Sequence, residues 1–175
     1  MVTRLGHVGI ICDDLMKTRD FYTRVIGLTV SDEDPGGNCF LTADINDEHH
    51  MLALAESRKA DHPNGPRPKT QGVGQISFIV KDLSALREFN RRFKKEGTPV
   101  LRTVTHGISV SIYFQDPEGN IAEVYYKTGY IIKQGLSRPI SLETQSDQEI
   151  LAFSKSFEAT MGPFQGAKLP VAPVG

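Results

Sequence analysis

Residues 5–15, LGHVGIICDDL, return further along the chain as VGQISFIVKDL at residues 73–83. Repeats of this size cannot bury a hydrophobic core alone and must pack together. A pair of repeats places equivalent positions around a shared centre. His7 and Gln75 occupy the same position in the two copies, so they are the first candidates for a functional site.

Each copy predicts one strand, one helix and three further strands. The helices are expected to begin after Asp14 and Asp82, which can accept hydrogen bonds from the first turn, and to end at Gly27 and Gly97. We predict an α+β fold in which two βαβββ modules form a cup-shaped mixed sheet with both helices outside. The later strands are expected at residues 28–31, 39–43 and 51–55, then 100–104, 108–114 and 121–126.

The domain organisation follows from the repeat. We predict one domain over residues 1–130, with module one at 1–56, a Pro- and Gly-containing linker at 57–72 and module two at 73–130. Residues 131–175 have no counterpart in the first copy and form a C-terminal extension. Ser146 and Glu149 have capping-box spacing ahead of an apolar pattern, which predicts one helix there.

Composition narrows the classes of function. The 175 residues are 39% hydrophobic and carry a formal net charge of −1, which suits a folded domain and lacks the basic patch typical of nucleic-acid binders. No apolar run is long enough to span a membrane and no leader pattern is visible, so we expect a cytoplasmic protein. Cys12 and Cys39 are expected to be reduced structural thiols.

The pattern resembles the vicinal oxygen chelate superfamily. The resemblance rests on the doubled module, on Phe21-Tyr22 leading through to Gly27-Leu28, and on YFQDPEGN at residues 113–120 followed by Glu123. That superfamily includes glyoxalase I, type I extradiol dioxygenases, fosfomycin-modifying enzymes and bleomycin-resistance proteins. It implies a cup with a divalent metal on the first and last strands of the modules.

Carried onto this sequence, the resemblance implies that His7, Gln75 and Glu123 are the metal ligands. The position equivalent to Glu123 in module one is Ala53, which cannot bind a metal. Glyoxalase I uses four protein ligands, whereas extradiol dioxygenases use three and leave positions open for a catechol and dioxygen. The set of three favours the dioxygenase branch, with Fe(II) as the expected ion and Mn(II) or another divalent ion as alternatives.

Gln75 departs from the extradiol pattern, where a second histidine is expected. A carboxamide retains an oxygen donor but is a weaker ligand for Fe(II) than imidazole. The resemblance also implies that Tyr113 hydrogen-bonds a substrate oxygen and that His106 positions the substrate. His49 and His50 are adjacent, and we expect their side chains to point to opposite faces rather than to share one ion.

The resemblance therefore predicts an extradiol ring-cleaving dioxygenase that acts on a catechol-type aromatic diol in aromatic catabolism. Its expected partners are a small aromatic substrate, dioxygen and a second copy of the chain in a homodimer, without nucleic acid or membrane. Two alternatives remain open: a glyoxalase-like lyase or isomerase, and a non-catalytic protein that sequesters an apolar ligand.

Overall fold

The computed structural model describes residues 7–34, 37–47, 49–57, 75–133 and 136–163. These residues form two compact units, which we describe separately. Unit 1 comprises Met1–Val73 together with Asp116–Asn120, and unit 2 comprises Gly74–Gln115 and Ile121–Gly175. The predicted linker at 57–72 lies outside the described residues except for Ser57.

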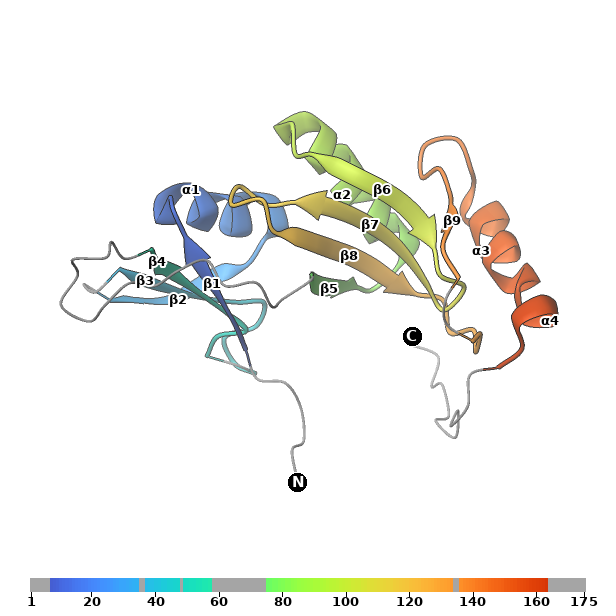
Figure 1. The fold of residues 1–175 in the computed structure, drawn as a ribbon, viewed down its shortest axis with the longest axis horizontal. Coiled ribbons are helices and arrows are strands. Elements are labelled where there is room, and N and C mark those ends of the chain that lie inside the picture. Colours follow the sequence, from blue (N-terminus) through green and yellow to red (C-terminus); the bar gives the residue numbers. More distant parts are fainter. Residues whose placement is uncertain (1–6, 35–36, 48, 58–74, 134–135, 164–175) are drawn as a thin grey trace, which may run out of the picture. The chain divides into compact units, whose positions relative to one another are not determined.

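Unit 1 contains a four-stranded mixed sheet and one helical segment (Figure 1). The strand order is β1-β4-β3-β2, with β1 and β4 parallel and the other neighbours antiparallel. The elements are β1 (Val8–Cys12), α1 (Leu15–Asp20), η1 (Phe21–Ile26), β2 (Thr29–Asp34), β3 (Asn38–Thr42) and β4 (Leu52–Glu56). The predicted strand–helix–three-strand module is confirmed, and its boundaries shift by one to three residues.

The helix of unit 1 begins as predicted, with the Asp14 carboxylate accepting a hydrogen bond from the Lys17 amide. It ends at Gly27, whose φ of 92° lies in the left-handed region that favours glycine. After six α-helical residues the segment continues as a π-helix, whereas the sequence predicted a single helix between Asp14 and Gly27. The wider π turn lets four large residues be buried together, namely Phe21, Tyr22, Val25 and Ile26.

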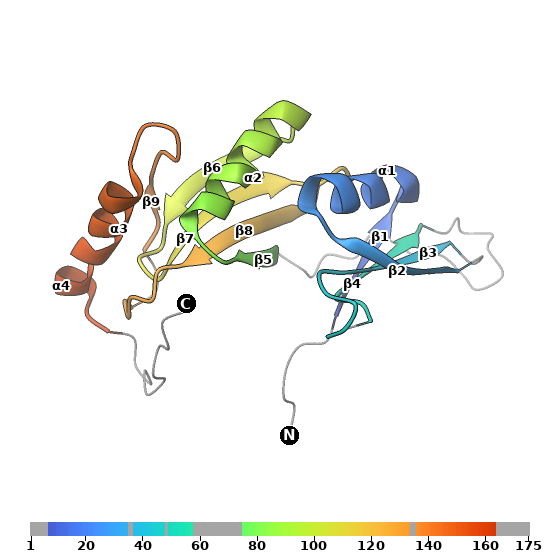
Figure 2. The same cartoon turned by 180° about the vertical axis from the view of Figure 1, so that it is seen from behind.

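Unit 2 contains a five-stranded sheet of order β5-β8-β7-β6-β9, in which β5 and β8 are parallel. Helix α2 covers one face of this sheet, behind it in Figure 1 and in front of it in Figure 2. The elements are β5 (Ile76–Val80), α2 (Leu83–Glu96), β6 (Val100–Thr105), β7 (Ser109–Gln115), β8 (Ile121–Lys127), β9 (Arg138–Pro139), α3 (Asp147–Ser156) and α4 (Glu158–Met161). The α+β class and the second module are confirmed.

The core of unit 2 lies between α2 and the sheet. Phe93 of α2 packs on Phe114 of β7 with their ring centroids 4.5 Å apart, and both side chains are fully buried. Side chains alternate between the two faces along strand β7, with Val110, Ile112 and Phe114 on this face. The opposite, polar face of β7 therefore points away from α2, and it carries the residues discussed below.

The C-terminal extension is part of unit 2. The predicted capping box is present at the start of α3, where the side chains of Ser146 and Glu149 each accept from the other residue's amide. The structure adds two elements that the sequence did not predict, the edge strand β9 and the short helix α4. Arg87 of α2 holds the extension by donating to the carbonyls of Leu142 and Gln145 and to the Asp147 carboxylate.

Cys12 and Cys39 are buried and free, as predicted. Burial raises the pKa of Cys12 to about 12 and that of Cys39 to about 11, so both stay protonated at neutral pH. No helix among the described residues is long and apolar enough to cross a membrane.

Candidate functional site

The candidate site lies on the face of the unit 2 sheet that α2 leaves uncovered. Strand pairing places four residues in one row across four strands: Ser77 of β5 opposite Glu123 of β8, Glu123 opposite Tyr113 of β7, and Tyr113 opposite Arg102 of β6. Directly paired residues project from the same face of a sheet. We call these four residues the polar row.

The same register in unit 1 gives a row without this chemistry. Gly9 pairs with Ala53, Ala53 with Phe40, and Phe40 with Asp32. Ala53 therefore occupies the position of Glu123, as the repeat predicted. In unit 1 only Asp32 of the row has a polar side chain, whereas all four residues of the polar row in unit 2 can form side-chain hydrogen bonds.

Glu123 is the buried anion of the polar row, with only 6% of its surface exposed. Its Oε2 accepts hydrogen bonds from Ser77 Oγ at 2.7 Å and from Gln75 Nε2 at 3.1 Å. Both donors are neutral, and no ion pair to Glu123 occurs among the described residues. A buried carboxylate ordinarily needs a positive charge to offset its loss of hydration.

Tyr113 and His106 form the second half of the site. The two side chains are joined by a hydrogen bond of 3.0 Å between Tyr113 Oη and His106 Nε2. Tyr113 retains only 5% exposure. The structure thus joins the two predicted catalytic residues, and strand pairing places Tyr113 directly beside the predicted ligand Glu123.

The C-terminal extension sets the tautomer of His106. His106 Nδ1 lies 2.6 Å from the carbonyl oxygen of Leu136, which can only accept, so Nδ1 carries the hydrogen. In neutral His106 the other nitrogen, Nε2, then has a lone pair and accepts from the Tyr113 hydroxyl. In protonated His106 the direction of this second bond reverses.

The surroundings of Tyr113 keep it protonated at neutral pH. Its pKa is raised first by burial and then by the negative charge of Glu123, while the guanidinium of Arg102 opposes the shift. The Arg102 Cζ atom lies 4.2 Å from the centre of the Tyr113 ring, in a cation–π contact. Tyr113 is therefore a hydroxyl donor with a charged neighbour on each side.

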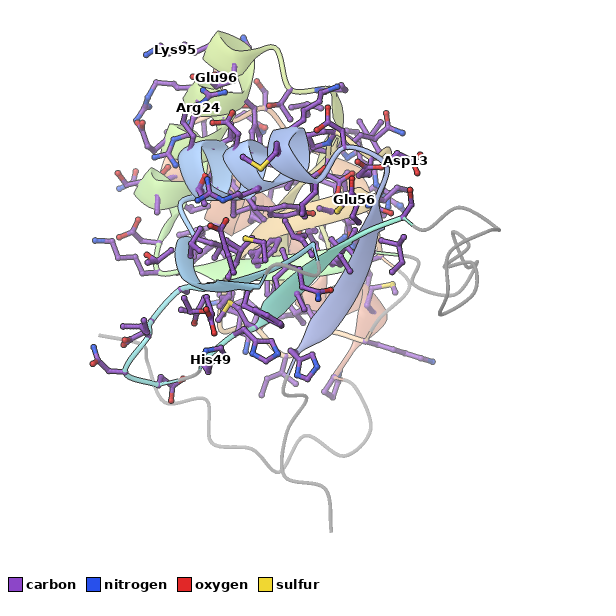
Figure 3. The ribbon with its side chains drawn as sticks, turned by 90° about the vertical axis from the view of Figure 1, so that its left-hand side faces the viewer. Asp13, Arg24, His49, Glu56, Lys95 and Glu96 are labelled. Carbon is purple, nitrogen blue, oxygen red and sulfur yellow. The ribbon has the colours of Figure 1, made fainter. Side chains whose placement is uncertain are left out.

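His7, the third predicted ligand, belongs to unit 1 and lies one residue before β1. It is exposed, and its ring contacts that of His50 at a centroid distance of 4.4 Å. His49, at the end of the unit 1 sheet opposite Asp13 and Glu56, is labelled in Figure 3. The arrangement forms a small group of imidazole rings beside Phe40.

The expectation that His49 and His50 point apart was wrong. Their Nδ1 atoms are 2.9 Å apart. Both residues precede β4, where the chain bends and the alternation of side chains along a strand does not apply.

The donor set of unit 2 suits a divalent cation. Glu123 supplies carboxylate oxygens, and a half-turn of the Gln75 amide would direct its oxygen instead of its nitrogen toward the same point. Oxygen donors of this kind suit Mg²⁺, Mn²⁺ and Fe²⁺. Among the described residues, no group of three or more His, Cys, Asp or Glu side chains is arranged to hold a metal ion. The pair of Gln75 and Glu123 falls outside that statement, because glutamine is not one of those four residue types.

Two residues of the polar row were not among the sequence predictions. Ser77 could have been found, because it lies two residues after Gln75 and a strand places such residues on one face. Arg102 could not, because a β-bulge between Val100 and Arg102 shifts the register of β6 on β7. Its contact with Tyr113 depends on that shift.

Comparison with known proteins identifies similar chains. Residues 4–124 match the model of the Glyoxalase/Bleomycin resistance protein/Dioxygenase superfamily. A biphenyl-2,3-diol 1,2-dioxygenase of Rhodococcus globerulus is 31% identical over 69% of this chain and 62% of its own length. A manganese-dependent 2,3-dihydroxybiphenyl 1,2-dioxygenase of Geobacillus genomosp. 3 is 27% identical over 71% of this chain and 37% of its own. The match thus spans about three-fifths or less of these relatives.

A solved structure gives a fuller match. The lactoylglutathione lyase of Agrobacterium tumefaciens is 29% identical, with a TM-score of 0.56, and the match covers 71% of this chain and 94% of that one. Together with the two βαβββ modules of the fold, the family match shows that this chain belongs to the Glyoxalase/Bleomycin resistance protein/Dioxygenase superfamily, the vicinal oxygen chelate superfamily.

Proposed function

We propose that the protein is a metal-dependent extradiol dioxygenase that cleaves the ring of a catechol-type aromatic diol. One observation carries the proposal: a buried carboxylate with only neutral partners lies beside a hydrogen-bonded tyrosine–histidine pair on one sheet face. The similarity to two dioxygenases of 2,3-dihydroxybiphenyl-type diols supports it. The reaction would break the carbon–carbon bond next to the diol and place both atoms of dioxygen in the product.

The proposed ligands of the ion are Gln75, Glu123 and His7. Gln75 and Glu123 are supported by their contact in unit 2, and His7 by its equivalence to Gln75 in the repeat. A divalent ion bound there would supply positive charge and sites for the two diol oxygens and dioxygen. We favour Fe(II), with Mn(II) as the alternative that the manganese-dependent relative supports.

The tyrosine–histidine pair supplies the proton chemistry in this proposal. Neutral His106 can take up at Nε2 a proton that the diol releases, relayed through the Tyr113 hydroxyl, while Leu136 holds Nδ1 in place. The new Nε2–H donates to Tyr113 Oη, which leaves the single hydrogen of the Tyr113 hydroxyl to be donated to an anionic substrate oxygen. Protonated His106 would then return the proton later in the reaction.

The test combines anaerobic metal titration with oxygen uptake on a panel of aromatic diols. We expect Glu123→Gln to weaken Fe(II) and Mn(II) binding by about tenfold or more, because it removes the anionic donor. Gln75→His should strengthen Fe(II) binding. Tyr113→Phe should retain metal affinity and lose ring cleavage, while Tyr130→Phe, at the last residue of module two, should change neither.

A glyoxalase-type lyase is the second candidate. It is favoured by the match to almost the whole length of the Agrobacterium lactoylglutathione lyase. An assay for lactoylglutathione turnover with the same metal-loaded protein separates the two. Absence of ring cleavage for every diol would overturn the dioxygenase proposal. Retained binding of an apolar ligand without either reaction would favour the sequestering alternative.

A further inference from the structure

Arg102 forms the outer end of the polar row. Its strand, β6, lies two strands from β8, which carries Glu123. With neighbouring strands about 4.8 Å apart, the backbones at Arg102 and Glu123 are separated by roughly 10 Å on one sheet face. Tyr113 lies between them in register. A flat ligand lying along the row from Glu123 would thus pass Tyr113 and reach Arg102.

A β-bulge gives Arg102 this position. The pairing of β6 with β7 skips Leu101, so that Val100 pairs with Phe114 and Arg102 with Tyr113. A bulge redirects the side chains that follow it and is common beside functional sites. The same irregularity occurs in unit 1 between Val30 and Asp32, where the equivalent end of the row carries the opposite charge. The positive charge is thus specific to the row that contains Glu123.

The guanidinium of Arg102 is held but not neutralised. It lies over the Tyr113 ring at 4.2 Å, and it makes no ion pair or hydrogen bond in the part of the chain that the structure describes. Stacking on an aromatic ring restricts a guanidinium while its in-plane N–H groups remain available. Those groups form a planar fork that fits both oxygens of a carboxylate.

We propose that Arg102 binds an acidic substituent of the ligand, so that the protein takes an aromatic diol carrying a carboxylate. This inference rests on the proposed function, because it takes the diol to bind at Glu123. The diol would occupy the Glu123 end of the row, Tyr113 would contact the middle of the ligand, and Arg102 would bind its acid group. Arg102 is exposed, so with a neutral diol its donors would bond solvent instead of the ligand.

The experiment measures binding without turnover. The full-length protein with Mn(II) is titrated anaerobically with 3,4-dihydroxybenzoate and with its neutral isostere 3,4-dihydroxybenzamide. We expect the acid to bind about tenfold or more tightly than the amide. Arg102→Met, which retains an apolar stem over Tyr113, should abolish that preference. Arg92→Met is the matched control, because Arg92 also lies over an aromatic ring, that of Phe89, at 5.1 Å.

Each outcome has one meaning. Equal binding of acid and amide, no binding of either, or a preference that survives Arg102→Met would overturn the proposal. A preference lost in Arg102→Met and retained in Arg92→Met supports it. Admitting air after the titration tests the dioxygenase separately. Acid-selective binding without ring cleavage would keep the Arg102 subsite and reject the proposed reaction.

Discussion

Ser111 of β7 carries a buried hydroxyl whose Oγ has no hydrogen-bond partner among the described residues. An unpartnered buried polar group costs about 1–3 kcal/mol. We therefore expect Ser111→Ala to leave the free energy of unfolding unchanged or to increase it by up to about 1 kcal/mol. Urea unfolding of the purified variant measures this.

The matched control is Ser154→Ala. Ser154 is equally buried, but its hydroxyl bonds Thr105 Oγ1 at 2.6 Å and the Ile150 carbonyl at 2.8 Å. Losing a satisfied buried hydroxyl should cost about 1 kcal/mol or more. Equal losses in the two variants would show that Ser111 has a partner, such as a bound water.

The raised pKa values of the two buried thiols make the free energy of unfolding depend on pH. Their folded pKa values, about 12 for Cys12 and about 11 for Cys39, lie above the value near 8.5 expected in the unfolded chain. Between these values the folded state holds protons that the unfolded state has lost. The stability that this provides is complete below pH 8.5 and is lost as pH rises, by about 1.4 kcal/mol per pH unit for each thiol.

Denaturant unfolding at pH 7.5, 8.5 and 9.5 checks this thiol effect. The wild-type protein should lose stability over the upper interval. Cys12→Ala combined with Cys39→Ala should start from a lower stability, because it leaves small cavities, but should show a flatter decline. Parallel declines in the two proteins would contradict the assignment to the thiols.

At the scale of elements, the C-terminal extension contacts the loop that carries His106. Gly107 has φ +77°, and a Cβ added there would lie 2.7 Å from Ile132 Cδ1 and 3.3 Å from two further Ile132 atoms. We expect Gly107→Ala to combine a backbone cost of about 1–2 kcal/mol with displacement of the extension. The displacement should weaken the bond between Leu136 and His106.

Gly97→Ala is the control for Gly107→Ala. Gly97 also has positive φ, +66°, but nothing lies within 4 Å of an added Cβ. Unfolding free energies and ¹⁵N chemical shifts of the His106 ring measure the difference. Gly107→Ala should be the less stable variant and alone should alter the Nδ1–H tautomer. If both variants lost the same unfolding free energy and neither changed the His106 chemical shifts, the extension would have no role in holding His106.

The elements also show what the sequence could predict. The repeat, the Asp14 and Asp82 caps and the Ser146 capping box are local signals, and the structure confirms each. The equivalence of Ala53 and Glu123 follows from the repeat and holds in the strand pairing. Local patterns do not predict a π-helical turn or a β-bulge. Each inserts an extra residue into a regular element, and its position depends on the element packed or paired against it. Arg102 was therefore missed.

At the scale of the whole molecule, one turn links distant parts of the sequence. Residues 116–120 connect β7 to β8 of unit 2 but pack as part of unit 1. Buried Asp116 accepts a hydrogen bond of 2.9 Å from the Tyr22 hydroxyl. Glu118 accepts from the amides of Asp13 and Asp14, both at 2.9 Å, and from Thr18 Oγ1. These two amides lie just before the first turn of α1, and a carboxylate is favoured there because a helix N-terminus carries partial positive charge.

The contacts of Glu118 predict that a substitution in this turn affects the start of α1. Glu118→Gln removes the negative charge and leaves one accepting oxygen, so the amides of Asp13 and Asp14, just before α1, lose their charged acceptor. We expect unfolding free energy to fall by about 1.5–3 kcal/mol. Hydrogen exchange measured by mass spectrometry should become faster over residues 13–18, although the substitution lies about a hundred positions away in sequence.

Glu88→Gln is the matched control, because Glu88 pairs only at the surface with Arg91 on the same helix. Such exposed pairs contribute at most about 0.5 kcal/mol, so exchange over residues 13–18 should remain unchanged. Faster exchange around residue 118 alone would show that α1 does not depend on Glu118. Faster exchange at both places would show that the turn between β7 and β8 stabilises the first helix of the other repeat.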